Sequence, residues 1–96
     1  MKIRLKLYGV FRSAAKTGNM ELDAAEGATV RSLVSQLVSQ DSYRSLKKFL
    51  LDSSTSDPRP NALILVSGRE INTLDGLDTV LRDGDELTIL PIAHGG

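Results

Sequence analysis

Two glycines, Gly95 and Gly96, close the sequence, and they follow a short stretch that contains Pro91 and His94. A C-terminal carboxylate that another enzyme activates has to enter that enzyme's nucleotide site, and glycine passes a narrow channel because it has no Cβ. A side chain at the last position would crowd the phosphate that the carboxylate attacks. Pro91 would stiffen the base of such a tail without blocking its tip, because its φ is fixed. The pattern predicts a reactive C-terminus at Gly96.

The alternative interpretation is a frayed end on which the two glycines are incidental, because chain termini are commonly disordered. His94 has no partner residues with which to form a catalytic set, so we interpret it as a recognition residue. The sequence contains no Walker A, HExxH or nucleophile-elbow pattern. We therefore expect a substrate or carrier rather than an enzyme.

The composition argues against several other classes of protein. The chain has 96 residues, with 12 Lys and Arg, 12 Asp and Glu, one histidine and no cysteine. Zero formal charge argues against direct binding of nucleic acid, and the lack of cysteine argues against a disulfide framework or a metal site. No apolar run approaches the ~20 residues of a membrane span, and the N-terminus lacks a signal-peptide core. We expect one cytoplasmic domain, monomeric alone, with no bound cofactor, metal or membrane.

The elements that must position the tail follow from hydrophobic periodicity. Strict alternation over residues 2–7 predicts a strand with one buried face. We expect it to continue through residues 8–11, with Gly9 as the alternative position of a bend or a strand end. Apolar residues at i, i+3, i+4, i+7 and i+8 over residues 30–38 predict a helix capped by Thr29. The other predicted elements are a strand over 19–24, a short helix over 43–50, a polar loop over 52–60, a strand over 62–66 that is buried on both faces or lies at the sheet centre, a short returning strand over 70–72 and a last strand over 86–90.

This order of elements predicts an α+β fold, because strand pairs flank a helical segment. Parallel first and last strands would need a crossover, and the helix over residues 30–38 would supply it. The arrangement is the ubiquitin-like β-grasp: a mixed sheet of about four to five strands with helices packed on one face. We assign residues 1–90 to this domain and residues 91–96 to a flexible C-terminal tail.

Alternation along the last strand also predicts a docking surface. Leu87 and Ile89 should point inward, so Leu90 should face outward beside Pro91 and Ile92. An exposed apolar cluster of this kind is a candidate contact for a partner protein. The competing interpretation is ordinary surface, because single exposed leucines are common.

Charge is unevenly distributed along the chain. Residues 1–16 carry five basic side chains and no acidic one, whereas residues 70–86 carry six acidic side chains and only Arg82 as a base. If the first and last strands are neighbours, these charges compensate one another internally. The alternative is a basic partner surface that includes Phe11 and Arg12 and that steers association with an acidic protein.

The ordered set of motifs resembles the β-grasp sulfur carriers. This family includes the molybdopterin synthase small subunit, the thiamine-pathway sulfur carrier, the ubiquitin-related modifier and the archaeal small modifiers. The resemblance rests on an acidic turn, a strand, a proline-containing exit and the final diglycine, together with several upstream segments. These segments are Tyr8-Gly9-Val10-Phe11-Arg12, Ala28-Thr29-Val30, Val66-Ser67-Gly68-Arg69-Glu70, Asp75-Gly76, Asp83-Gly84-Asp85-Glu86 and Leu90-Pro91-Ile92-Ala93-His94-Gly95-Gly96.

The resemblance implies that an activating enzyme uses ATP to adenylate the Gly96 carboxylate. Sulfur transfer from a persulfide would then give a C-terminal thiocarboxylate, or a target lysine would take the carboxyl in an isopeptide bond. Leu90, Pro91, Ile92 and His94 would contact partner proteins. Exposed lysines of the chain itself, Lys16, Lys47 and Lys48, are candidate acceptors.

The branches of the family differ in the tail. The molybdopterin synthase small subunit usually has a second proline where this chain has Ile92, and a His-Gly-Gly ending looks more like the ubiquitin-related modifier, which serves in tRNA thiolation and conjugation. Residues 67–76 look more like the archaeal modifiers. We favour a carrier that is also a modifier, with a tRNA-thiolation enzyme or the molybdopterin synthase large subunit as a further partner. The alternatives are a dedicated molybdopterin synthase small subunit and a β-grasp interaction module with an incidental diglycine.

Overall fold

A computed structural model describes residues 1–92, and residues 93–96 lie outside the described part. The elements, in chain order, are the strand β1 (Lys2–Leu7), the helix α1 (Gly9–Ala15), β2 (Asn19–Asp23), α2 (Val30–Val38), the 3-10 turn η1 (Asp41–Tyr43), α3 (Arg44–Leu50), β3 (Ala62–Val66), β4 (Arg69–Glu70), the 3-10 turns η2 (Ile71–Thr73) and η3 (Gly76–Asp78), and β5 (Glu86–Pro91).

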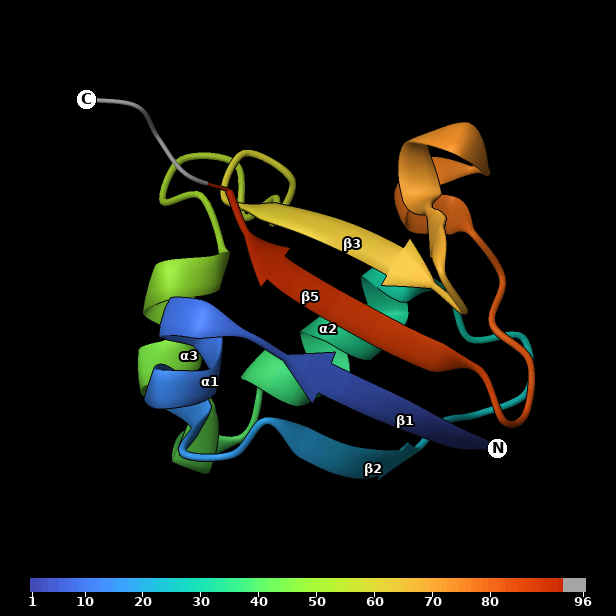
Figure 1. Cartoon of the computed structure of the whole chain (residues 1–96), viewed down its shortest axis with the longest axis horizontal. Coiled ribbons are helices and arrows are strands. Elements are labelled where there is room, and N and C mark those ends of the chain that lie inside the picture. Colours follow the sequence, from blue (N-terminus) through green and yellow to red (C-terminus); the bar gives the residue numbers. More distant parts are fainter. Residues whose placement is uncertain (93–96) are drawn as a thin grey trace.

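The strands of the described residues form one mixed sheet of five strands in the order β2-β1-β5-β3-β4. β1 and β5 are parallel neighbours, and the other pairs are antiparallel. β5 therefore lies in the centre, flanked by β1 and β3, although it is the last strand in the sequence (Figure 1). The β-grasp prediction is confirmed, including the parallel pairing of the first and last strands.

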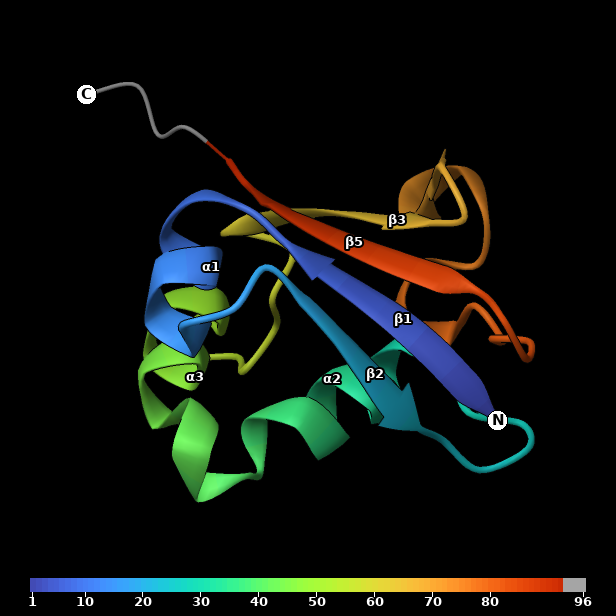
Figure 2. The same cartoon turned by 60° about the horizontal axis from the view of Figure 1, so that its bottom comes forward.

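The three helices pack on one face of the sheet and leave the other face open (Figure 2). Alternation along β1 and β5 sends Ile3, Leu5, Leu7, Leu87 and Ile89 towards the helices, and each is at most 1% exposed. The inward direction predicted for Leu87 and Ile89 is confirmed. Their burial holds β5, and with it the base of the C-terminal segment, in the middle of the core.

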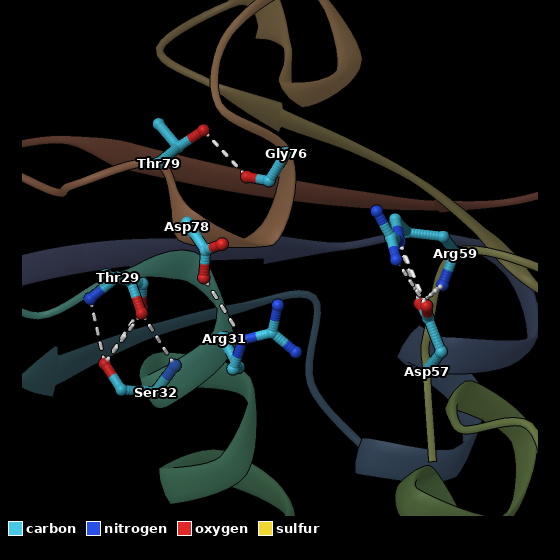
Figure 3. Close-up of polar contacts among 8 residues, drawn as sticks. All are labelled: Thr29, Arg31, Ser32, Asp57, Arg59, Gly76, Asp78 and Thr79. Atoms are coloured by element: carbon cyan, nitrogen blue, oxygen red, sulfur yellow. Dashed lines mark hydrogen bonds and ion pairs between the residues drawn. The ribbon is translucent and has the colours of Figure 1, made fainter. Parts of the chain in front are cut away.

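The crossover helix α2 begins as its sequence predicts. The Thr29 hydroxyl accepts the backbone N–H of Ser32 at 3.2 Å, and the Ser32 hydroxyl accepts the backbone N–H of Thr29 at 2.8 Å. These reciprocal bonds, drawn in Figure 3, satisfy two N–H groups that a helix N-terminus would otherwise leave unpaired. The predicted cap is confirmed and fixes where the crossover starts.

The prediction that the first strand continues through residues 8–11 is wrong. β1 ends at Leu7, and Gly9 turns the chain with a φ of +57° into α1. Phe11 and Ala15 lie one helical turn apart and are both buried, at 1% and 8% exposure. The helix therefore places both apolar side chains on the face of α1 that packs into the core.

Two other sequence interpretations need correction. Residues 62–66 form β3, but Leu63 is 38% exposed, because the face of the sheet on which it lies is not covered by helices. The returning strand β4 is only Arg69–Glu70, since Ile71 turns into the core at 1% exposure. The Glu70 carboxylate accepts the backbone N–H of Asn72 and caps the 3-10 turn that follows.

Candidate functional site

The candidate site is the point where β5 leaves the sheet. β5 continues through Pro91, one residue beyond the predicted domain boundary, and Pro91 pairs with Ala62 of β3. Leu90 is half-buried rather than exposed, whereas Pro91 and Ile92 are exposed. The predicted residues 90–92 thus lie together at the exit. His94, Gly95 and Gly96 lie outside the described residues.

Hydrogen bonds from the β3 side hold the exit. The backbone N–H of Ile92 donates to the carbonyl oxygen of Asn61 at 3.1 Å, so pairing continues past the end of the strand. The Asn61 side-chain amide in turn donates to the carbonyl of Leu50, the last residue of α3, at 3.1 Å. The base of the tail is therefore tied through Asn61 to the helical layer.

Four apolar side chains gather around the exit, and we call them the exit patch: Tyr8, Leu63, Leu90 and Ile92. Leu63 and Leu90 are direct cross-strand partners and so share one face. Tyr8 follows directly after β1 and donates its backbone N–H to the carbonyl of Ile89 at 3.3 Å. Tyr8, Leu63 and Ile92 are 42%, 38% and 41% exposed. An apolar surface at the root of a C-terminal tail is suited to contact with a protein partner.

Of the two residues in the second predicted partner surface, Phe11 and Arg12, only Arg12 is exposed. Phe11 is 1% exposed and packs in the core, so the prediction that it belongs to a partner surface is wrong. Its burial follows from the helical turn of α1, which points it towards α3 and the sheet. Arg12 is exposed, and its side chain lies over Gly18: a Cβ on Gly18 would be 3.1 Å from Nε of Arg12.

The uneven charges compensate one another across the sheet. Glu86 of β5 lies 3.9 Å from the Arg4 guanidinium and 3.5 Å from the Lys6 ammonium, both on β1. Lys2 pairs with Asp23 at 2.9 Å, and this contact lowers the pKa of the Asp23 carboxyl. The pairs are partly or largely exposed, so each stabilises the fold only slightly. Internal compensation accounts for much of the basic strand.

A hollow that the sequence analysis did not predict lies between α2 and the loop of residues 52–60. Its volume is about 310 Å³, and charged pairs stand beside it (Figure 3). Arg31 donates to Asp78 at 3.3 Å, and Arg59 donates to Asp57 at 2.6 Å, which lowers the pKa of Asp57. These charges satisfy one another, and within residues 1–92 no buried side-chain nitrogen or oxygen lacks a partner. The charged groups beside the hollow are therefore paired with one another.

A metal site and a membrane span both lack a counterpart in the part of the chain that the structure describes. Residues 1–92 contain no group of three or more His, Cys, Asp or Glu that could hold a metal ion. Over the same residues, no helix has the length and apolar character that a membrane span requires. Lys16, Lys47 and Lys48, the candidate acceptors, are exposed.

Fold and site together define a ubiquitin-like β-grasp domain whose central strand presents a C-terminal segment beside an apolar patch. The sequence pattern of the ThiS family matches residues 5–96, and the chain belongs to this family of small sulfur carriers and protein modifiers, which are not themselves enzymes.

Similar proteins support this assignment. A candidate sulfur carrier protein of Archaeoglobus fulgidus is 38% identical over 79 residues, which is 82% of this chain and 85% of that protein. Small archaeal modifier protein 3 of Haloferax volcanii is 29% identical over 96 residues and matches along the whole of both chains. The solution structure of small archaeal modifier protein 1 from Methanosarcina acetivorans superposes with a TM-score of 0.83 at 31% identity, covering 99% of this chain and 96% of that one.

Proposed function

We propose that the Gly96 carboxylate is the reactive group of this protein and that an ATP-dependent activating enzyme adenylates it. The observation that carries the proposal is the exit of β5, where a central strand hydrogen-bonded on both sides delivers the segment that ends in the diglycine. Membership of the ThiS family supports it. In this function the enzyme binds the folded domain, and the C-terminal carboxylate of the same chain is the group that reacts.

Activation is needed because a carboxylate is a poor electrophile. A Gly96 carboxylate oxygen attacks the α-phosphorus of ATP, pyrophosphate leaves, and the acyl adenylate that forms has AMP as a good leaving group. Glycine at the last two positions lets the backbone approach the nucleotide without a side chain in the way. The reaction occurs in the enzyme's site, and this chain supplies the acyl group.

Sulfur enters in the next step of the proposed sequence. A persulfide on the activating machinery attacks the acyl carbon and displaces AMP, which gives an acyl disulfide. A cysteine thiolate then attacks the disulfide sulfur that lies farther from the acyl group, so that a protein disulfide forms and Gly96 keeps one sulfur as a thiocarboxylate. The carrier itself has no cysteine that could compete for the activated end.

Conjugation uses the same activated carboxyl. A lysine amine of a target protein attacks the acyl carbon, the activating group leaves, and an isopeptide bond forms with loss of the amine proton. We propose both outcomes for this chain, since the relatives that it resembles carry the names of sulfur carriers and of modifiers. The sulfur acceptor is tRNA through a thiolation enzyme, or the molybdopterin precursor with a synthase large subunit.

The exit patch is proposed as the surface that the activating enzyme contacts. Leu90 and Ile92 contribute to it, and Pro91 and His94 complete the contact along the tail. Arg12 is exposed in the last turn of α1 and is proposed as a separate contact for a partner protein. Docking on the domain lets the enzyme discriminate this tail from other chains that end in glycine.

Intact-mass spectrometry tests the proposal. The protein is incubated with the activating enzyme of its own genome, ATP and a persulfide donor, in parallel with a variant that lacks Gly95 and Gly96. We expect the mass of the full chain to rise by the difference between sulfur and oxygen and the mass of the truncated variant to stay unchanged. The absence of both a thiocarboxylate and any lysine adduct would refute the proposal.

A further inference from the structure

Pro91 fills the space that a side chain on Gly9 would occupy. A Cβ built on Gly9 would lie 2.7 Å from Cγ of Pro91, 3.4 Å from its Cδ and 3.9 Å from its Cβ. The first of these distances is far shorter than van der Waals contact between carbons. The proline ring therefore lies directly against the first residue of α1, although the two residues are 82 positions apart in the sequence.

A hydrogen bond holds the exit on the β3 side, and the direction of the strand explains why a proline fits on the β1 side. On the β3 side, Ile92 donates to the Asn61 carbonyl at 3.1 Å. Backbone hydrogen bonds alternate along a strand, so Pro91 directs its backbone nitrogen towards the opposite side, where β1 has already ended at Leu7. A proline suits this position because no strand partner there needs its N–H.

We propose that Gly9 is a positioning residue for the reactive tail. Its missing side chain lets Pro91 sit between α1 and Asn61, and this fixes the direction in which the chain leaves β5. The inference rests on the proposed function, because the direction matters through the distance from the anchored domain to the nucleotide site. A tail that leaves at another angle keeps Tyr8, Leu63 and Leu90 of the exit patch for docking and loses its alignment with ATP.

The chain supplies a matched control for backbone strain. Gly9 and Gly84 both have a positive φ, of +57° and +85°, so alanine is strained at either position. A Cβ on Gly84 would meet no atom within 4 Å, whereas a Cβ on Gly9 would collide with Pro91. Comparison of Gly9→Ala with Gly84→Ala therefore separates the collision from the strain.

Amide hydrogen exchange on the isolated protein tests the contact without any partner. Gly9→Ala should accelerate exchange of the Ile92 amide about fivefold or more, because displacement of Pro91 weakens the bond to Asn61. Gly84→Ala should leave this rate within about twofold of the wild type. In a Pro91→Ala background, which removes Cγ and Cδ, adding Gly9→Ala should change the rate by less than about twofold.

Kinetics with the activating enzyme test the positioning role. In ATP–pyrophosphate exchange, Gly9→Ala should lower kcat about tenfold and leave KM for the carrier within about twofold, because docking is intact and alignment is lost. Gly84→Ala should leave both constants near the wild type, and Pro91→Ala should abolish the additional effect of Gly9→Ala.

Two results would overturn the inference: equal behaviour of the Gly9 and Gly84 variants in either measurement, or a Gly9→Ala effect that persists fully in the Pro91→Ala background. Adenylation of Gly96 and the role of Gly9 at the exit are tested independently. If the wild-type protein is not adenylated at all, the proposed function fails, while the exchange rate of Ile92 still decides whether Gly9 sets the exit.

Discussion

Asn61 accepts the backbone N–H of Ile92 and donates its side-chain amide to the carbonyl of Leu50, each at 3.1 Å. One residue thus connects the exit of β5, the start of β3 and the end of α3. The exit of β5 at Ile92 is consequently anchored to the layer of helices as well as to the sheet.

Removal of the Asn61 amide should weaken this anchor. Asn61→Ala keeps the backbone bond to Ile92 but deprives the part-buried Leu50 carbonyl of its donor, which should cost about 1–2 kcal/mol of unfolding free energy. Urea denaturation measures the effect. Asn72→Ala is the control, because the Asn72 side chain donates to Glu70 at an exposed position. Equal stability of the two variants would contradict this role for Asn61.

The central position of β5 makes its inward residues the most costly to truncate. Ile89 is 0% exposed, and Ile89→Ala should destabilise the domain by about 2–5 kcal/mol through lost burial and the cavity that remains. Thr88→Ala, on the open face of the same strand, should cost less than about 1 kcal/mol. Thermal and urea unfolding of both variants provide the comparison, and a Thr88 effect as large as that of Ile89 would rule out this orientation of β5.

Acid stability should depend on the loop carboxylate Asp52. The backbone N–H groups of Thr55 and Ser54 and the Thr55 hydroxyl each donate to it at 3.0 Å, and these bonds lower the pKa of Asp52. The ionised carboxylate therefore stabilises the fold above the ordinary aspartate pKa of about 3.9. This contribution is lost as the pH falls through the lower pKa of the folded state.

Asp52→Asn tests this linkage. The variant should be less stable than the wild type at about pH 7, and the difference should shrink as the pH approaches about 2, measured by urea denaturation across the range. The control is Glu26→Gln, which removes one negative charge from an exposed residue. A constant difference at every pH for Asp52→Asn would show that the charge of Asp52 does not contribute.

The exit patch should determine affinity for the activating enzyme. Ile92→Asp places a charge in the patch and should raise KM for the carrier about tenfold, since desolvation of a carboxylate at an apolar contact is costly. Val80, 58% exposed and outside the patch, provides the matched control Val80→Asp. Both proteins should keep the wild-type circular dichroism spectrum. If both variants raise KM equally, the enzyme does not dock on the exit patch.

Local patterns predicted most of the fold. Alternation over residues 2–7 and the helical spacing of residues 30–38 depend on near neighbours, and both elements form within the expected bounds. Phe11 was misplaced because the pattern around Gly9 fits a strand end and a helix start equally well. The left-handed φ of Gly9, which decides between them, depends on the packing of α1 against α3 and β5.

Features that join distant segments could not be predicted in this way. The exposure of Leu63 depends on which face of the sheet the helices cover, and an apolar run does not encode that choice. Arg31 and Asp78 are 47 residues apart, so no periodicity signals their pairing beside the hollow between α2 and residues 52–60. The contact between Gly9 and Pro91 likewise follows from the parallel pairing of β1 with β5.

The most direct test of the central claim is ATP-dependent pyrophosphate release by the activating enzyme with two forms of the carrier. One form ends at Gly96, and the other carries a single additional tryptophan after it. The two forms should have the same circular dichroism spectrum and melting temperature, since the addition lies beyond the core. We expect the unmodified carrier to support pyrophosphate release and the extended form to support none above background. Equal release from both forms would contradict the claim that an unencumbered Gly96 carboxylate is the group that the enzyme activates.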